Sequence, residues 1–185
     1  MLQPISFETE KLRVHSFRTS DVENYKQLAL EVLPILSDPF TLRFVPEKRL
    51  NNIEAAEDYI KTMFINHHVG RNHLHFIFSK DMDRVIGIVD LIAPKVVEEH
   101  YQLPEYPYFI EFYLLEMLSG RLVMTELLPE IIKEVQRQGI EKIAAVVNRQ
   151  NKAAIKVLQR SGFQLQASFD IIQDLYLVSV SEPNP

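Results

Sequence analysis

The chain of 185 residues contains no cysteine and only five glycines. The absence of cysteine excludes disulfide bonds, thiolate metal sites and a cysteine nucleophile. Because glycine is favoured where the backbone needs a positive φ or a close approach, each of the few glycines is informative. Gly139 and Gly162 each follow a helical pattern, as glycine commonly does just past a helix end. Gly120 lies in a short loop between a predicted strand and a predicted helix.

The chain also lacks any apolar run of about 20 residues, the length that a membrane-spanning helix needs. Its first residues, MLQPISFETEKLRV, do not place a basic segment before an apolar one, so we expect no secretory signal. These two absences favour a cytoplasmic protein without a membrane partner. The net charge of −5 argues against nucleic acid as a ligand, because phosphate binding needs clustered lysine and arginine. An acidic surface suits a cationic acceptor such as an amine, although solubility explains it equally well.

What is present fits one domain, 1–185, because a chain of this length can bury a full core. In its first half, 1–93, alternating apolar residues predict strands at 11–17, 73–79 and 85–93, the last two forming a hairpin. Ser20 and Glu23 have the spacing of a capping box and open a predicted helix that reaches Leu36. A second helix is predicted at 53–66, and Asn51 or Asn52 can cap its start.

Glycine and proline mark two further positions along the chain. Gly87 lies inside a predicted strand, where glycine indicates a bulge or a close backbone approach. The segment 94–108 contains three prolines and little periodicity, which predicts a long surface connection. Its tyrosines permit a homodimer without requiring one.

The stretch 109–163 organises the rest of the chain. It predicts a strand at 109–116, a loop at 117–122, a helix at 123–138, a strand at 142–147 and an asparagine-led helix at 151–163. Pro129 removes one helical hydrogen bond, so we expect a kink or a restarted turn there. Strands at 163–169 and 175–181 close the chain. In such a βαβα unit the loop can set main-chain N–H groups at a helix N-terminus against an anion, and an ordinary connecting loop is the alternative.

These motifs resemble the GNAT N-acetyltransferases, and in particular the branch that acetylates the N-termini of ribosomal proteins. TEKLRVHSFRTSD (Thr9–Asp21), TLRFVPE and VIGIVDL are similar to the first half of that branch. IEFYLL resembles the strand that ends in the splayed cofactor cleft, SGRLVMTELL (Ser119–Leu128) the pyrophosphate loop with its helix, and NKAAIKVLQRSGF the asparagine helix. The resemblance covers nearly the whole chain.

The resemblance implies an α/β (α+β) fold: a mixed, mostly antiparallel, twisted sheet of about seven strands with helices on both faces. It divides the chain into an acceptor-side half at 1–93, a connection at 94–108, an acetyl-CoA-binding core at 109–163 and closing strands at 163–181. The cofactor cleft would lie between the strand that holds Glu111 and the strand that ends at Asn148. The implied activity is acetyl-CoA-dependent transfer of an acetyl group to a primary amine, either a protein N-terminus or a small amine such as a polyamine or an antibiotic.

The site that follows from the resemblance has two parts. Acetyl-CoA, the only cofactor expected, would be bound by residues at the end of the strand, in the loop and at the helix starts: Leu114, Leu115, Leu118, Ser119, Gly120, Arg121, Leu122, Val123 and Asn151. Glu111 would be the catalytic base that deprotonates the amine, because an acid inside an apolar strand is partly buried and binds a proton more readily. A glutamate paired with a lysine or arginine is the alternative. Asn148 would contact the acceptor or bridge a water, unless it is only a turn residue.

Three departures from the family pattern keep a second hypothesis open, a catalytically silent CoA-binding or interaction module. Leu122 occupies a position that is usually small, and Met117 one that is usually Gln or Arg. Ala154 and Leu158 match positions where relatives supply a serine or a tyrosine that protonates the leaving thiolate. Solvent, Tyr113 or Ser119 would then supply that proton, or the enzyme would be slow.

Asp170 and the paired histidines are weaker candidates for functional residues. Asp170 lies in or beside the closing strands, either near the acceptor or as a solvated turn residue. The pairs His67-His68 and His73-x-His75 have no carboxylate partner that the sequence fixes, so we expect no metal.

Overall fold

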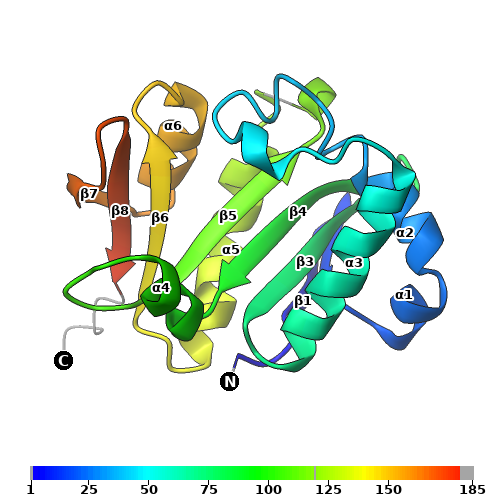
Figure 1. The fold of residues 1–185 in the computed structure, drawn as a ribbon, viewed down its shortest axis with the longest axis horizontal. Coiled ribbons are helices and arrows are strands. Elements are labelled where there is room, and N and C mark those ends of the chain that lie inside the picture. Colours follow the sequence, from blue (N-terminus) through cyan, green and yellow to red (C-terminus); the bar gives the residue numbers. More distant parts are fainter. Residues whose placement is uncertain (1, 119, 180–185) are drawn as a thin grey trace. The chain divides into compact units, whose positions relative to one another are not determined.

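A computed structural model describes residues 2–118 and 120–179 (Figure 1). Hydrogen bonds join eight strands of this part of the chain in the order β1-β2-β3-β4-β5-β6-β8-β7. The strands are β1 (Ser6–Glu8), β2 (Leu12–Ser16), β3 (Asn72–Ser79), β4 (Arg84–Ile92), β5 (Tyr108–Leu114), β6 (Lys142–Asn148), β7 (Gln164–Ser168) and β8 (Gln173–Ser179). The pairs β1–β2, β2–β3, β6–β8 and β7–β8 are antiparallel, and the pair β5–β6 is parallel. The predicted mixed, mostly antiparallel sheet is confirmed, and β1 is the strand that the sequence pattern did not indicate.

Six α-helices and two short 3₁₀ helices accompany these strands in the described residues. They are α1 (Thr19–Glu23), α2 (Tyr25–Val32), α3 (Ile53–His68), α4 (Pro94–His100), α5 (Val123–Arg137), α6 (Lys152–Arg160), η1 (Pro46–Lys48) and η2 (Glu116–Leu118). No helix of the described chain is long and apolar enough to cross a membrane. The chain forms two compact units, which we call the N-terminal unit (Met1–Leu91 with Glu111–Ser119) and the C-terminal unit (Ile92–Ile110 with Gly120–Pro185).

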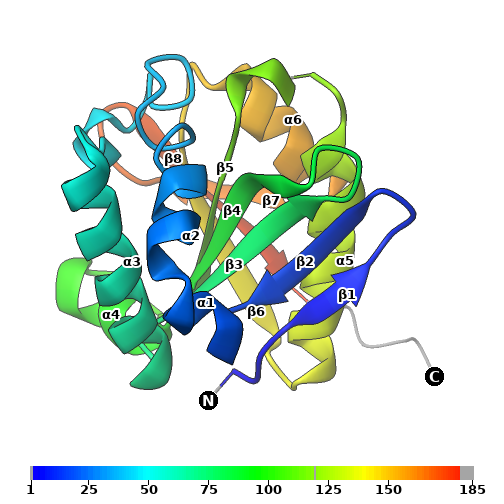
Figure 2. The ribbon, with the colours of Figure 1, turned by 90° about the vertical axis from the view of Figure 1, so that its right-hand side faces the viewer.

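In the N-terminal unit, α2 and α3 lie side by side and α3 packs against β3 (Figure 2). The helix α3 begins as predicted, because the Asn52 side chain accepts a 2.8 Å hydrogen bond from the Ala55 amide. Its stripe of Ala56, Ile60 and Met63 is buried. The apolar periodicity of 53–66 therefore marks the face that contacts the unit's core.

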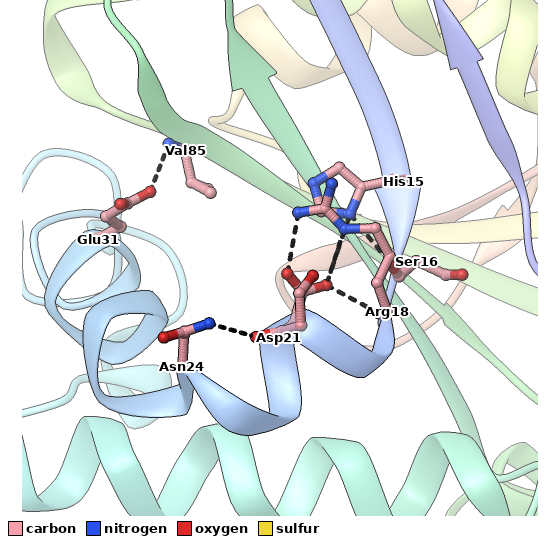
Figure 3. Close-up of polar contacts among 8 residues, drawn as sticks. His15, Ser16, Arg18, Asp21, Asn24, Glu31 and Val85 are labelled. Carbon is pink, nitrogen blue, oxygen red and sulfur yellow. Dashed lines mark hydrogen bonds and ion pairs between the residues drawn. The ribbon is translucent and has the colours of Figure 1, made fainter.

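The first helix of this unit begins earlier than the sequence pattern indicates. Instead of Ser20, Arg18 is the N-cap, and its amide donates 2.8 Å to Oδ2 of Asp21. The Arg18 guanidinium also bonds the same carboxylate, at 2.9 and 3.2 Å (Figure 3). Asp21 is buried, and a buried carboxylate needs such donors, so the capping box uses Asp21 rather than Glu23. The predicted helix to Leu36 is also interrupted, at Asn24, and ends at Val32.

Gly87 explains how β4 and β5 approach each other within the N-terminal unit. A Cβ at this position would lie 2.4 Å from Cδ2 of Leu114 and 2.9 Å from the carbonyl oxygen of Tyr113. The close backbone approach predicted for this glycine is confirmed. It brings β4 against the half of β5 that contains Glu111.

In the C-terminal unit, α4 corrects the prediction that 94–108 is irregular. Pro94 occupies the first helical turn, where its missing N–H breaks no helical bond, and VVEEH continues the helix to His100. Val97 of α4 packs with Phe109 of β5 and Ala144 of β6 in a small core. The prolines of this segment therefore predicted an irregular structure where the first half is helical.

The remaining elements of this unit follow the predicted order. The stripe Leu128, Ile131, Ile132 and Val135 of α5 is buried, and the helix continues through Pro129 without a restart. The closing strands are β7 and β8, while Ser181 lies outside the described residues. In the described residues, β5 pairs in parallel with β6 at Tyr108–Ile143 and Phe109–Ala144, whereas β6 pairs with β8 along its whole length.

Candidate functional site

Glu111 lies on β5 in the N-terminal unit and has two hydrogen-bond partners. Lys48 Nζ donates to Oε2 over 2.7 Å, and the Tyr113 hydroxyl donates to the same oxygen over 3.1 Å. About a third of the Glu111 side chain is exposed, at 32%. The geometry thus contains the lysine pairing that the sequence left open, and it leaves the carboxylate within reach of solvent.

Lys48 is the last residue of η1, a helix that begins at Pro46. Its ammonium group is the positive charge next to Glu111. Burial alone would lower the pKa of Lys48, but the charge of Glu111 and the hydrogen bond to it outweigh burial and raise that pKa. The ammonium group therefore stays charged at neutral pH and balances one carboxylate.

Asp90 on β4 is a second acid that the sequence reasoning did not single out. It is 7% exposed, and its Oδ2 accepts a 2.7 Å hydrogen bond from the side-chain amide of Asn72 on β3. Burial, and after it the charge of Glu111, raises the pKa of Asp90 to about 7. The signal was available, because Asp90 interrupts the apolar strand VIGIVDLIA as Glu111 interrupts FIEFYLL.

Two tyrosines contribute hydroxyl groups near these acids. Burial, followed by nearby carboxylates, raises the pKa of Tyr59 and of Tyr113 well above the ordinary value. Both phenols therefore keep their protons at neutral pH and act as neutral donors. A phenol with such a pKa is poorly matched to the protonation of a thiolate, so Tyr113 is a weak candidate for that step.

The segment from the end of β5 through η2 holds three of the residues expected to bind the cofactor: Leu114, Leu115 and Leu118. The Leu114 carbonyl accepts from the Thr41 hydroxyl over 3.0 Å, and the Leu115 amide donates to the Ile86 carbonyl over 3.0 Å. Leu118 is buried and its amide donates to the Leu115 carbonyl. Its neighbour Ser119 lies outside the described residues.

In the C-terminal unit, the loop from Gly120 leads into α5. Gly120 has φ +78° and no atom within 4 Å of a Cβ placed on it, so its backbone angle rather than crowding favours glycine. Leu122, the N-cap, has φ 61° and a side chain that is mostly exposed. A leucine in this left-handed region is uncommon and strained. No side chain of the described residues caps α5, so the helix start that Val123 opens has only main-chain donors.

Asn148 and Asn151 both make local hydrogen bonds. The Asn148 side chain accepts from the Gln150 amide over 2.9 Å, which is a turn contact. The Asn151 side chain accepts from the Ala154 amide over 3.1 Å, which confirms its predicted capping of α6. In α6, Leu158 is fully buried, so the position where relatives have a tyrosine belongs to the core here.

Arg149 was missed by the sequence reasoning and fixes the turn between β7 and β8. Its Nε donates to Asp174 over 2.7 Å, and its terminal nitrogens donate to the carbonyls of Asp170, Ile171 and Gln173. The Asp170 carboxylate accepts from two amides of the same turn, at 2.8 and 2.7 Å. Asp170 is thus a turn-stabilising residue, the second of the two roles considered for it.

Three histidines of the N-terminal unit lie near the end of α3 and on β3: His67, His73 and His75. His67 and His73 rings meet at 5.4 Å, and His73 and His75 are almost fully buried. Burial lowers the pKa of His73 to about 4 and that of His75 to about 3. No group of three or more His, Asp or Glu side chains in 2–118 and 120–179 is arranged to hold a metal ion.

Comparison with known protein families identifies one match. The family profile described as "Acetyltransferase (GNAT) domain" matches residues 11–164, well over half of the chain. A comparison with curated protein sequences gave no significant match.

Solved structures with the same fold include several acetyltransferases. RimL, a ribosomal L7/L12 alpha-N-protein acetyltransferase in complex with coenzyme A, has a TM-score of 0.71 at 17% identity and covers 96% of this chain and 98% of its own. A ribosomal-protein-S5-alanine acetyltransferase from Vibrio fischeri has a TM-score of 0.67 at 16% identity, with coverage of 98% and 100%. The microcin C7 self-immunity acetyltransferase MccE, in complex with acetyl-CoA and AMP, has a TM-score of 0.64 at 16% identity, with coverage of 93% and 94%. At these identities the likeness establishes a shared fold.

Proposed function

The chain belongs to the GNAT acetyltransferase family, and on that premise we propose that it transfers the acetyl group of acetyl-CoA directly to a primary amine. The family match over residues 11–164 carries this proposal. The acceptor is a protein N-terminus or a small amine, and the reaction has no covalent enzyme intermediate. CoA is the leaving group.

The C-terminal unit supplies the diphosphate contact in this proposal. The first amides of α5, from Val123 onward, have no partner within the helix, and no described side chain caps them. These donors and the helix dipole favour an anion, and the Arg121 guanidinium adds a positive charge to the same loop. Asn151 at the start of α6 is the proposed contact to the pantetheine arm.

The N-terminal unit supplies the base. Glu111 is hydrogen-bonded to Lys48, its side chain is about a third exposed, and in this proposal it accepts a proton from the acceptor ammonium. The amine nitrogen then attacks the thioester carbonyl carbon and loses its second proton to water. The C–S bond breaks, and the thiolate leaves with the electron pair. We assign protonation of the thiolate to water, because Leu158 is buried in the core and Tyr113 holds its proton too tightly. Asn148 stays a candidate contact to the acceptor.

Among the acceptors, a protein N-terminus has the most support. Two of the structures that share the fold are described as ribosomal-protein acetyltransferases, one of them acting on an α-amino group. Polyamines and aminoglycosides are the small amines that the same chemistry would accept.

Acetyl-CoA binding and acetyl transfer are tested separately. At 100 times Kd, acetyl-CoA should raise the free energy of unfolding by about 2.7 kcal/mol in a denaturation titration. Release of free CoA thiol should accelerate with a peptide that has a free N-terminus and not with the same peptide acetylated, and polyamines and aminoglycosides complete the panel. Glu111→Gln should reduce kcat/KM by about 100-fold or more while leaving the acetyl-CoA stabilisation intact, because general-base catalysis contributes that much. Glu54→Gln, an exposed glutamate of α3, is the matched control.

A catalytically silent CoA-binding module is the second candidate function. The strained Leu122 in the loop and the absence of a hydroxyl at Ala154 and Leu158 favour it. Stabilisation by acetyl-CoA without thiol release on any amine would establish this second function and exclude the first. No stabilisation at millimolar acetyl-CoA would exclude both.

A further inference from the structure

Asp90 on β4 has one carboxyl oxygen without a hydrogen-bond partner in the described residues. Asp90 is more than nine-tenths buried, and its Oδ2 is held by Asn72 at 2.7 Å. Its Oδ1 is buried and accepts no hydrogen bond from any described residue. Buried polar atoms are nearly always bonded in folded proteins, so a carboxyl with one open oxygen indicates a functional group or a bound proton.

The groups that interact electrostatically with Asp90 come from four elements, and their charges do not balance when both acids are ionised. Asn72 on β3, Tyr59 on α3 and Tyr113 on β5 are neutral, while Glu111 on β5 is an acid and Lys48 in η1 is the one cation of this set. Lys48 is hydrogen-bonded to Glu111, not to Asp90, in the described structure. Two carboxylates therefore share one ammonium, and one added proton would neutralise the group.

We propose that Asp90 and Glu111 hold a single proton between them, and that the pair, once it has lost this proton, is the base that accepts a proton from the acceptor ammonium. This inference rests on the proposed acetyl transfer and deepens it. Glu111 is the member that the acceptor reaches, because it is partly exposed and Asp90 is not. Asp90 is a positioning residue, since its charge strengthens Glu111 as a base without touching the substrate.

The proton balance of the step is simple. One N–H bond of the ammonium breaks and its proton moves to a Glu111 oxygen, while the freed nitrogen lone pair forms the bond to the thioester carbon. The attached nitrogen then loses its second proton to water, and water returns a proton to the departing thiolate. The pair passes its proton to water after the thiolate has left. A burial-raised pKa of about 7 for Asp90 is consistent with this, because a base is most effective when it loses its proton near the working pH.

The shared proton can be measured without any reaction, by following carboxyl ¹³C shifts against pH in the full chain. The Asp90 signal, assigned by its loss in Asp90→Asn, should titrate near neutral pH. In Glu111→Gln the Asp90 titration should move down by about one pH unit, because the charge of Glu111 is one of the causes that raise its pKa. Asp81→Asn, which changes an exposed acid of the β3–β4 turn, should leave the titration of the Asp90 signal unchanged. An Asp90 carboxyl that titrates below pH 5, or one that is indifferent to Glu111→Gln, overturns the proposal.

Use of the pair in catalysis is measured by the pH profile of thiol release. Asp90→Asn keeps the shape of the side chain and its contact to Asn72, and it should move the acidic limb of kcat/KM down by about one pH unit and lower the plateau several-fold. A proportionate loss at every pH, with an unmoved limb, would mean a merely structural Asp90 and would overturn the proposal. If acetyl-CoA binds but no amine reacts, the proposed transferase function fails and the catalytic use of the pair fails with it, whereas an active enzyme with an unmoved limb leaves the function standing.

Discussion

Lys48 Nζ lies 2.7 Å from Glu111 Oε2, and the two residues are 63 positions apart in the chain. The contact joins η1 to β5 and gives the catalytic candidate its counter-ion. Both side chains are about a third exposed, so the pair is screened by solvent.

We expect Lys48→Met to change chemistry more than stability. Exposed ion pairs contribute about 0 to 1 kcal/mol, so the free energy of unfolding should fall by no more than about 1 kcal/mol. Because the charge of Lys48 lowers the pKa of Asp90, its removal should raise that pKa above about 7. The acidic limb of the pH–rate profile should move to higher pH, opposite to the shift in Asp90→Asn. Lys61→Met, which removes an exposed lysine paired with Asp58, is the control. It should leave the pKa of Asp90 and the acidic limb of the pH–rate profile unchanged.

We expect the buried histidines to make the fold sensitive to acid. The unfolded chain binds a proton on each imidazole at about pH 6.5, whereas burial lowers the pKa in the folded chain to about 4 for His73 and about 3 for His75. The unfolded state therefore binds more protons between these values, and stability falls as the pH is lowered from about 6.5. Asp90 acts in the opposite direction, because its pKa is raised from 3.8 to about 7 on folding.

His75→Leu isolates one of these contributions. Between pH 6 and pH 4 the slope of unfolding free energy against pH should become flatter by about 1.4 kcal/mol per pH unit, as measured by urea denaturation. His100→Gln, which removes an exposed histidine, should not flatten it. An unchanged slope in His75→Leu would contradict a neutral, buried imidazole at this position.

Leu122→Gly should relieve backbone strain at the start of α5. The leucine has φ 61°, a conformation that costs a non-glycine residue about 1 to 2 kcal/mol, while glycine itself loses about 0.5 to 1 kcal/mol of chain entropy. The net gain in unfolding free energy should be about 0.5 kcal/mol, and acetyl-CoA should bind more tightly because the loop loses a bulky side chain. Leu122→Ala, which keeps the strain but not the bulk, separates the two effects in an acetyl-CoA titration.

Gly87→Ala should be the more damaging of two glycine substitutions. The new Cβ would clash with Leu114 and with the Tyr113 carbonyl, so β4 and β5 must move apart, at about 1 to 3 kcal/mol. Gly120→Ala meets no neighbour and should cost only the strain of its positive φ, about 1 kcal/mol. Equal losses in thermal denaturation would show that crowding at Gly87 is absorbed elsewhere.

Local sequence patterns predicted the fold better than they predicted the candidate site. Hydrophobic periodicity and caps such as Asn52 and Asn151 predicted α3, α5, α6 and most strands, because these signals are local in sequence. The prediction failed at α4, where Pro94 opens a helix instead of preventing one. It also failed at the start of α1, where Asp21 forms the cap expected from Glu23.

The candidate site could be predicted only in part. Glu111 was recognisable as an acid in an apolar strand, and Asp90 carried the same signal. Their partners could not be read from the chain, because Lys48 is 63 residues from Glu111 and Asn72 is 18 residues from Asp90. Such contacts arise from strand order and helix packing, which no short window of sequence records.

The turn held by Arg149 has a consequence for how this protein can diverge. Three of the guanidinium contacts end on main-chain carbonyls, which every amino acid provides, while the side chains of Ile171 and Ile172 are largely exposed. Substitutions of Ile171 and Ile172 should therefore leave the β7–β8 hairpin unchanged. The exposed surface of this turn can therefore change in sequence as long as Arg149 and the two aspartates, Asp170 and Asp174, are retained.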